Sequence, residues 1–198
     1  VTGVQTCALP ISNYSGFIND IGGVEKYAST PMVYDIAAME SLYGGQMNKN
    51  SGDTVYSYGA GLDDAVLQTI YDTGGIDTFD ASNQFRGVEI DLAPGSFSSI
   101  GFFQRATITP GGELVDITTE AQENIGIAFS TNIENAIGSR FGDVIHGNNI
   151  ANHLQGGRGD DELDGLDGDD HLSGQIGDDL YKVTVANGND MIADDGAG

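Results

Sequence analysis

The chain has 198 residues, of which 30 are Asp or Glu and only 7 are Lys or Arg, so its formal net charge is −23. Such an acidic surface repels polyanions and anionic membrane leaflets, which excludes nucleic acid as a partner. No apolar run approaches the roughly 18 residues that span a bilayer, and the single Cys allows no disulfide within the chain. We therefore expect no membrane span and no nucleic-acid partner.

Residues 1–11, VTGVQTCALPI, match the translation of a sequencing-library adapter. We expect them not to belong to the natural protein, and we exclude them from the fold prediction as one excludes a fusion scar. The alternative interpretation is a weak strand that buries Cys7. If the adapter interpretation holds, the natural part of the chain has no cysteine.

The clearest helical signal covers 31–43, within TPMVYDIAAMESLYGG. Thr30 can cap the helix, Pro31 suits its first turn, and Gly44 can adopt a positive φ after its end. Apolar residues at helical spacing between Met32 and Tyr43 form a stripe that must pack against another part of the protein.

Between Ser51 and about Ile137 the pattern changes to short β-prone runs separated by Gly, Asp and Asn. We expect a twisted β layer there, with strands near 54–58, 65–71, 87–92 and 124–130. The segment 107–123 receives no assignment.

A nine-residue period begins at Gly138 and continues to Lys182 through the units GSRFGDVIH, GNNIANHLQ, GGRGDDELD, GLDGDDHLS and GQIGDDLYK. Three columns of this alignment stay in register, which marks a true repeat. The columns are Gly138, Gly147, Gly156, Gly165 and Gly174 in position one; Asp143, Asn152, Asp161, Asp170 and Asp179 in position six; and Ile145, Leu154, Leu163, Leu172 and Tyr181 in position eight. A degenerate sixth unit follows a two-residue insertion and places Asp190 in position six and Ile192 in position eight.

This spacing predicts a solenoid in which two units make one coil. Position eight lies on a short strand and points inward, whereas the Gly-rich residues before it turn the chain. Units n and n+2 then stack at about 4.8 Å. Asp143, Asp161 and Asp179 line one edge, and the opposite edge has Asn152, Asp170 and Asp190. Acids stacked this closely repel each other, so oxygen ligation of a hard divalent cation is expected, with Ca²⁺ favoured over zinc.

Three other interpretations fit less well. A flexible Gly/Asp linker has no reason to keep an apolar residue at every ninth position. An EF-hand loop beginning at Asp160 would place His171 where a bidentate carboxylate is required. A zinc site from the three histidines lacks any His-x-x-x-His pair, and we expect solvated loop histidines instead.

The unit GGRGDDELD resembles the GGxGxDxUx pattern of RTX (repeats-in-toxin) parallel β-rolls. The segments TPMVYDIAAMESLYGG, SGDTVYSYG, DTGGIDTFD and NIENAIG occur in the same order in serralysin-type (peptidase M10) secreted metalloproteases. The resemblance, which extends over nearly everything after residue 11, implies a mainly β fold. In this fold a parallel β-roll at 138–198, truncated at its C-terminus, joins a β-sandwich-like calcium-binding layer at 46–137. Residues 12–45, with their helix, resemble the end of the protease domain.

The resemblance also implies calcium ligands, many of them backbone oxygen atoms. The first implied site has Asn50, Gly52, Thr54, Asp72, Gly74 and Asp77, and the second has Gly75, Asp77, Asn132 and Glu134. Two sites in the roll share Asp161: one has Ser139, Phe141, Asp143, Gly156, Arg158 and Asp161, and the other has Gly157, Gly159, Asp161, Gly174, Ile176 and Asp179. The opposite edge has Asn148, Ile150, Asn152, Gly165, Asp167 and Asp170. Phe141 and Ile150 replace the usual Gly and Asn152 replaces the usual acid, so we expect weaker binding at these positions.

The zinc motif HExxHxxGxxH and the Met-turn of the family are not found in this sequence, so we expect no peptidase activity from this chain. Zn²⁺ is expected only in the protease domain of a longer parent. The resemblance further implies export by type I secretion machinery, an extracellular location and a monomer. An RTX module of an adhesin or of a non-protease secreted enzyme, and a stand-alone calcium-binding protein, remain alternative hypotheses.

Overall fold

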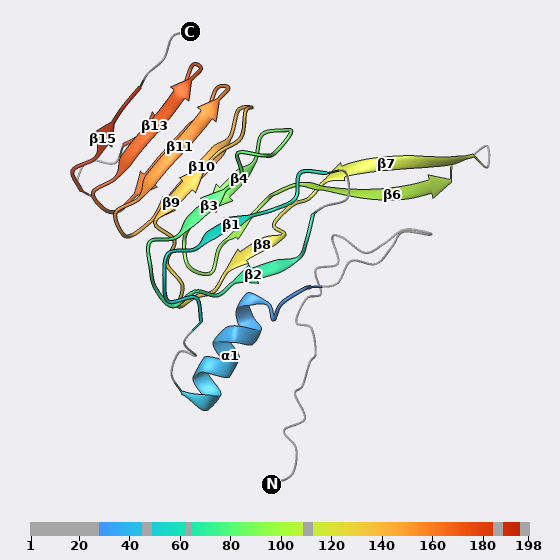
Figure 1. Cartoon of the computed structure of the whole chain (residues 1–198), viewed down its shortest axis with the longest axis horizontal. Helices are drawn as coiled ribbons and strands as arrows, with labels where there is room; N and C mark the ends of the chain where they lie inside the picture. The colour runs from blue at the N-terminus through green and yellow to red at the C-terminus, as the bar shows by residue number, and fades with distance from the viewer. Residues whose placement is uncertain (1–27, 45–48, 62–64, 109–112, 184–187, 195–198) are drawn as a thin grey trace.

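The computed structural model describes residues 28–44, 49–61, 65–108, 113–183 and 188–194. The stretch attributed to an adapter lies outside these residues. Within the described part, one helix and fifteen strands are present, and no helix there is long and apolar enough to cross a membrane. The two larger sheets are wholly parallel, and Figure 1 shows their strands stacked side by side along the molecule.

Two parallel sheets form the roll. The six-stranded sheet has the spatial order β1 (Val55–Ser57), β3 (Thr78–Asp80), β9 (Asn135–Ile137), β11 (His153–Arg158), β13 (His171–Ile176) and β15 (Met191–Ile192). The four-stranded sheet has the order β14 (Leu180–Lys182), β12 (Glu162–Leu166), β10 (Val144–Asn148) and β4 (Glu89–Asp91). Successive strands of the repeat alternate between the two sheets, so two units make one coil.

The position-eight side chains form the interior of this roll. Ile145 pairs with Leu163 in one sheet and Leu154 with Leu172 in the other, so residues 18 apart in sequence lie on neighbouring strands. All four side chains are completely buried in one hydrophobic cluster. The predicted stacking of alternate units and the inward direction of position eight are therefore confirmed.

Parallel pairing also extends into the segment before the repeat. Phe79 of β3 pairs with Ala136 of β9, and Ile90 of β4 pairs with Ile145 of β10. Phe79 and Ile90 are fully buried in the same cluster as the position-eight residues. The predicted mainly β fold with a parallel β-roll is confirmed, and its two sheets share one core across residue 138.

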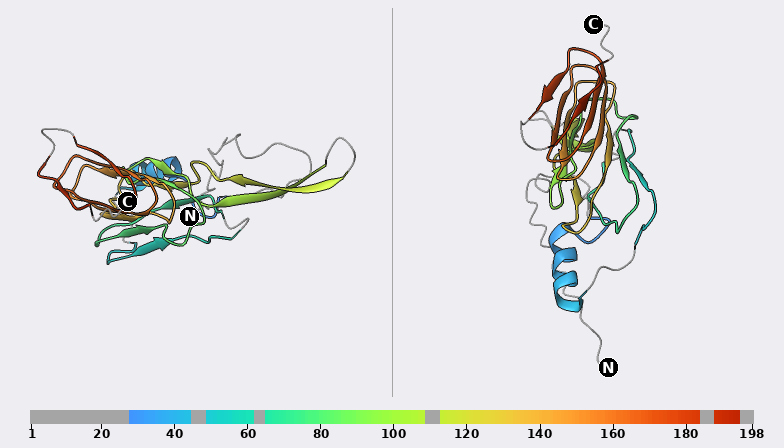
Figure 2. Two further views of the ribbon diagram at one scale, coloured as in Figure 1. Left: turned by 90° about the horizontal axis from the view of Figure 1, so that it is seen from above. Right: turned by 90° about the vertical axis from the view of Figure 1, so that its left-hand side faces the viewer.

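Two smaller sheets complete the β structure. A three-stranded sheet has the order β2 (Gln68–Ile70), β8 (Ile125–Ile127) and β5 (Phe97–Ser98), and an antiparallel hairpin consists of β6 (Phe102–Ile108) and β7 (Leu114–Glu120). Figure 2 shows this hairpin projecting away from the other strands. The segment that the sequence left unassigned thus contains β7 and the last residues of β6, which pair in register from Phe102↔Glu120 to Ile108↔Leu114.

The helix α1 (Val33–Tyr43) begins later than its sequence signal suggests. Met32 is the N-cap residue, and its backbone N–H donates to the Asp35 carboxylate at 3.1 Å. Thr30 instead pairs with β2, since its Oγ1 accepts a hydrogen bond from the Thr69 N–H at 2.7 Å. Gly44 has a φ of 69°, so its predicted role after the helix end is confirmed.

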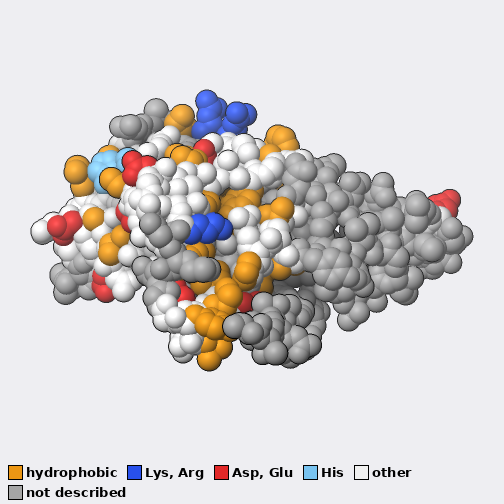
Figure 3. Space-filling view, turned by 60° about the horizontal axis from the view of Figure 1, so that its bottom comes forward, with side chains coloured by type: hydrophobic (Ala, Val, Ile, Leu, Met, Phe, Trp, Pro, Cys, Tyr) orange, Lys and Arg blue, Asp and Glu red, His pale blue; other side chains and the backbone are white. Residues whose placement is uncertain are grey.

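Only part of the helical apolar stripe is buried in the described structure. Val33 and Ile36 pack inward, whereas Leu42 and Tyr43 are 76% and 69% exposed. Figure 3, which brings the lower side of Figure 1 forward, shows hydrophobic side chains exposed on this face and acidic side chains scattered over it. The partner predicted for the exposed part of this stripe is not found among the described residues.

Candidate metal centres along the roll

The first carboxylate row consists of Asp143, Asp161 and Asp179, each directly before a strand of the four-stranded sheet. Each Oδ1 accepts a hydrogen bond from the backbone N–H one coil earlier. Val88 N donates to Asp143 at 2.7 Å, Asp143 N to Asp161 at 2.8 Å, and Asp161 N to Asp179 at 2.9 Å. The parallel pairing of the strands therefore holds the three carboxylates in one column.

The second carboxylate row precedes strands of the six-stranded sheet and contains Asp77, Glu134, Asp170 and Asp190, with Asn152 between Glu134 and Asp170. Its contacts repeat the pattern of the first row. Thr54 N donates to Asp77 Oδ1 at 2.9 Å, Asp77 N to Glu134 Oε2 at 2.7 Å, and Asn152 N to Asp170 Oδ1 at 2.8 Å. The two acidic edges predicted from the sequence are thus brought together as columns of side chains.

In four of these carboxylates, the second oxygen atom is buried without a protein partner. In the described structure, Oδ2 of Asp77, Asp161, Asp170 and Asp179 has no hydrogen bond. The position-one glycines make room for it, because a Cβ at Gly156, Gly165 or Gly174 would overlap the Oδ2 atom of the acid in the same unit. Burying a charged oxygen atom costs free energy unless a hydrogen-bond donor or a cation pairs with it. Each of these Oδ2 atoms is therefore a candidate ligand of a cation.

Burial raises the pKa of Asp143, Asp161 and Asp170 in these rows. Desolvation, followed by repulsion from Asp143 and Asp179, raises the pKa of Asp161 to about 7. Desolvation and the neighbouring Asp190 raise the pKa of Asp170 to about 6, and desolvation also raises the pKa of Asp143. Without a cation, the fold therefore disfavours the charged form of these groups.

Carbonyl oxygen atoms predicted as ligands lie beside the rows. A Cβ at Gly157 would overlap the Ser139 carbonyl oxygen, one at Gly168 would lie 2.6 Å from that of Ile150, and one at Gly147 would lie 2.5 Å from that of Gly165. The turns of alternate units are therefore in close contact. Ile176 is different, because its carbonyl oxygen already accepts a hydrogen bond from Gly159 N at 2.8 Å.

Side chains at several implied positions point away from the rows. Phe141 is 46% exposed, and Ile176, Arg158 and Asp167 are also exposed. Only the backbone oxygen atom of these residues can serve as a ligand.

The residues implied for the first site also converge. Thr54 Oγ1 donates to the Gly52 carbonyl at 2.9 Å, and Gly74 N donates to Asp72 Oδ1 at 3.0 Å. Asp72 and Asp77 are both buried, and desolvation together with Asp72 and Glu134 raises the pKa of Asp77 to about 6. Asn132 and Gly75, implied for the second site, are exposed.

Sequence reasoning missed Tyr56 and Thr131 in this region. The Tyr56 hydroxyl donates to Asp72 Oδ2, and Asn50 Nδ2 in turn contacts that hydroxyl at 3.1 Å. Asp72 N donates to Thr131 Oγ1 at 2.9 Å. Their 16- and 59-residue separations from Asp72 left no local signal for either contact.

The donor chemistry of both rows fits a calcium ion. No group of three or more His, Cys, Asp or Glu side chains converges in the described part of the chain, so an ion here depends on carbonyl oxygen atoms. Carboxylate and carbonyl oxygens together are the ligands of Ca²⁺, which accepts six to eight of them in flexible geometry. The unpartnered Oδ2 atoms and the adjacent carbonyls supply that combination.

The histidines do not form a metal ligand set among the described residues. His153 and His171 lie on neighbouring strands rather than in loops, with ring centroids 4.6 Å apart in an edge-to-face arrangement. Desolvation and the proximity of His171 lower the pKa of His153. His146 lies in β10, so the expectation of loop histidines is wrong for all three.

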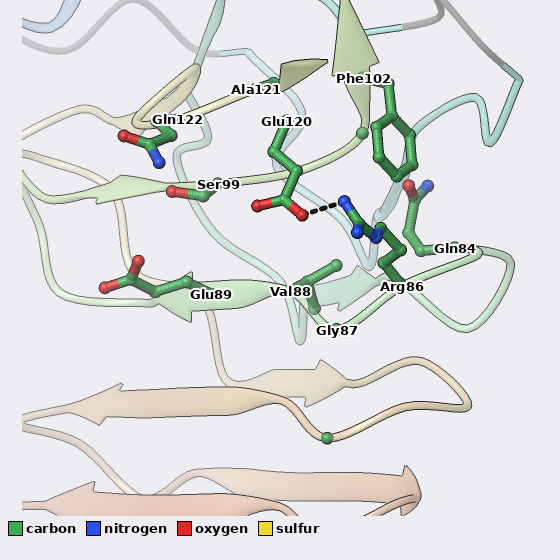
Figure 4. A pocket seen from close by; sticks show the side chains of 12 residues that line it. Gln84, Arg86, Gly87, Val88, Glu89, Ser99, Phe102, Glu120, Ala121 and Gln122 are labelled. Carbon is green, nitrogen blue, oxygen red and sulfur yellow. Dashed lines mark hydrogen bonds and ion pairs between the residues drawn. The ribbon is translucent and has the colours of Figure 1, made fainter. Parts of the chain in front are cut away.

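A separate pocket of about 410 Å³ lies between β4 and the base of the hairpin. Arg86 forms an exposed ion pair with Glu120 there, and its guanidinium lies 5.5 Å from the Phe102 ring centre (Figure 4). Because this ion pair is solvated, we attribute to it at most a local structural role.

The sequence comparisons identify the repeat. Residues 146–181 match the model of the RTX calcium-binding nonapeptide repeat, in four copies. This match includes Asp161, Asp170 and Asp179, three of the four row acids with an unpartnered Oδ2.

Serralysins and a related metallopeptidase are among the curated proteins that the chain resembles. The chain is 36% identical to a serralysin of Proteus mirabilis, over 65% of this chain and 24% of that protein. It is 38% identical to the metallopeptidase AprA of Pseudomonas marginalis, over 68% of this chain and 26% of that protein. With a serralysin of Photorhabdus laumondii, the identity is 34% over 75% of this chain and 29% of that protein. The predicted resemblance to the serralysins is confirmed, and the chain spans about a quarter of the length of these curated relatives.

Proposed function

We propose that this chain is a calcium-dependent folding module of a secreted, serralysin-like zinc metalloendopeptidase. In this proposal Ca²⁺ bridges successive acids of each row and closes the coils outside the cell, and the closed roll stabilises the attached protease domain. The repeat match and the serralysin relatives support the calcium chemistry and the parent class. Export by type I secretion machinery and a monomeric state belong to the same proposal.

The observation that carries the proposal is the unpartnered Oδ2 of Asp161, Asp170 and Asp179, buried at successive coils. Their Oδ1 atoms are bonded to the preceding coil, so the closed roll holds each of these carboxylates in a fixed position. An ion that contacts Oδ2 and the carbonyl oxygens of two turns removes the cost of burying negative charge. Binding and closure of the roll are then one event, as in other metal-coupled folds.

The proposed ligands of the roll are those implied by the family pattern. On the first row, Asp161 is shared between an ion with Ser139, Phe141, Asp143, Gly156 and Arg158 and an ion with Gly157, Gly159, Gly174, Ile176 and Asp179. On the second row, one ion has Asn148, Ile150, Asn152, Gly165, Asp167 and Asp170. The two earlier ions have Asn50, Gly52, Thr54, Asp72, Gly74 and Asp77, and Gly75, Asp77, Asn132 and Glu134.

Circular dichroism and thermal unfolding with and without calcium test the proposal. We expect millimolar Ca²⁺ to increase the β signal and to raise Tm by roughly 10 °C or more, because several ions bind only the folded state. An unchanged spectrum and an unchanged Tm after calcium addition would show that the rows are not calcium sites.

A further inference from the structure

One step of the second carboxylate row is built differently from the others. Asn152 occupies the row position between Glu134 and Asp170, and its Nδ2 donates to the carbonyl oxygens of Ile133 at 3.2 Å and Glu134 at 3.1 Å. The acids of both rows do the opposite, because their Oδ1 accepts a backbone N–H from the preceding coil. The direction of the contact between coils is therefore reversed at this step.

The orientation of the Asn152 amide follows from its partners. Its Oδ1 accepts a hydrogen bond from Asn148 N at 2.8 Å, and that backbone group can only donate. Its nitrogen faces two carbonyl oxygens, which can only accept. A flipped amide would lose all three hydrogen bonds, so the reversal does not depend on how the two amide atoms are assigned.

Asn148 adds a second amide at the same place. Its Nδ2 donates to Leu92 O at 3.2 Å and Ile133 O at 2.8 Å, and its Oδ1 accepts from Ile150 N at 3.1 Å. Both asparagines are at least 96% buried, and neither has an unpartnered amide atom in the described structure. We call Asn148, Asn152 and the carbonyls of Leu92, Ile133 and Glu134 the amide step.

In the amide step, side-chain N–H groups satisfy the converging carbonyl oxygens, which a bound cation would otherwise coordinate. Carbonyl oxygens of separate segments converge on it, and four N–H···O contacts satisfy them. At Asp161, Asp170 and Asp179, by contrast, the carboxylate Oδ2 atom has no partner in the described structure. Buried, fully satisfied hydrogen bonds of this kind hold segments together without any ligand.

We propose that the amide step takes the place of a cation between Glu134 and Asn152, a step of the second row to which no ion was assigned above, so that the coil joining β9, β10 and β11 closes without calcium and gives the later, calcium-dependent coils a folded edge on which to assemble. This inference rests on the proposed function, because it divides the roll into a calcium-independent part and a calcium-dependent part. Closure would then proceed from β11 toward β15 as calcium becomes available.

Residue-resolved hydrogen exchange on the full chain in calcium-depleted buffer tests the inference. The reporters of the amide step are the N–H groups of His153, bonded to Glu134 O, and Gly138, bonded to Gln155 O. The reporters of the later coils are those of His171, bonded to Asn152 O, and Leu180, bonded to Asp161 O. Without calcium, we expect exchange at His153 and Gly138 to be at least tenfold slower than at His171 and Leu180.

Matched variants test whether the Asn152 amide itself, rather than the loop around it, protects the His153 N–H from exchange. Asn152→Ser removes both donated hydrogen bonds and should lower protection of the His153 amide at least tenfold without calcium, with no recovery on adding it. Asn149→Ser, at an exposed neighbouring position, should leave protection unchanged. Asn152→Asp places a carboxylate against the Ile133 and Glu134 carbonyls, so protection should be lost without calcium and restored by it.

The outcomes distinguish the two proposals. Equal exchange at all four reporters without calcium, or an Asn152→Ser variant as protected as the original chain, overturns the amide step. If calcium leaves the protection of His171 and Leu180 unchanged, the proposed function fails instead. Because Asn152→Asp is measured with calcium as well, the test does not depend on a variant that stays folded without it.

Discussion

Asp161 is the row acid whose loss should matter most, since it contacts the coils on both sides. Its Oδ1 accepts from Asp143 N, and its own N–H donates to Asp179 Oδ1. We expect Asp161→Asn to lower the stability of the calcium-loaded chain by roughly 2–3 kcal/mol, because an isosteric amide keeps the shape but loses a charged ligand of two ions. Thermal unfolding in millimolar calcium measures the loss.

Asp167→Asn is the matched control for this substitution. The Asp167 side chain is exposed and only its carbonyl oxygen is proposed as a ligand, so the variant should unfold at the same temperature as the original chain. If Asp161→Asn lowers Tm no more than Asp167→Asn does, the proposal that Asp161 is shared by two calcium ions is contradicted.

The raised pKa values of Asp161 and Asp170 predict how pH affects the calcium-free chain. The pKa of Asp161 is about 7 and that of Asp170 about 6, against an ordinary Asp value of 3.8. Because the folded state binds these protons more tightly than the unfolded state, their stabilising contribution is complete below pH 3.8 and is lost as pH rises to about 7. Calcium-free Tm should therefore be higher at pH 5 than at pH 8.

Thermal unfolding in calcium-depleted buffers across this pH range tests the linkage. Asp161→Asn should flatten the dependence, since the amide does not titrate. A Tm that rises between pH 5 and pH 8 without calcium would mean that these carboxylates are not buried as the structure shows.

At the scale of single elements, each strand of the repeat is anchored by one inward side chain. Leu163 of β12 is completely buried, between Ile145 and Tyr181 in the register of the four-stranded sheet. We expect Leu163→Ala to cost about 2–5 kcal/mol of unfolding free energy, with or without calcium, because it leaves a cavity in the core. Leu180→Ala, at a 54% exposed position, should cost far less in the same chemical denaturation experiment.

The elements that could be predicted are those whose signals are local or periodic. The period of nine placed Leu154, Leu163 and Leu172 in the core and the acids in two rows, because every copy repeats the same physical constraint. The hairpin β6–β7 was missed, since its pairing joins residues up to 18 positions apart without a repeated pattern.

Contacts between distant segments account for the other differences. Thr30 bonds to Thr69 rather than capping the helix, across 39 residues. The partners of the Asn148 amide, Leu92 and Ile133, precede it by 56 and 15 residues. The sequence showed that an asparagine replaced the usual acid, but only the fold shows which carbonyls it faces.

At the scale of the whole molecule, the net charge of −23 can be compensated in two ways, by general screening or by ions at fixed sites. Thirteen of the 30 acids lie from Gly138 onward, but Asp143, Asp161 and Asp170 among them are distinguished by their burial. Salt screens exposed charges over about 10 Å at 0.1 M and 3 Å at 1 M, yet it reaches buried pairs much less. Because these carboxylates are buried, we expect a bound cation to stabilise the rows more than an increase in ionic strength does.

This difference predicts that calcium stabilises the full chain more than sodium chloride or magnesium does. At equal ionic strength, calcium should raise Tm by roughly 10 °C or more, whereas sodium chloride should raise it by only a few degrees. Magnesium should resemble sodium, because it demands near-octahedral geometry at about 2.1 Å and gives up its water reluctantly. If sodium chloride or magnesium reproduced the calcium effect, the acidity would act through its overall charge, and the buried Oδ2 atoms would not be the binding groups.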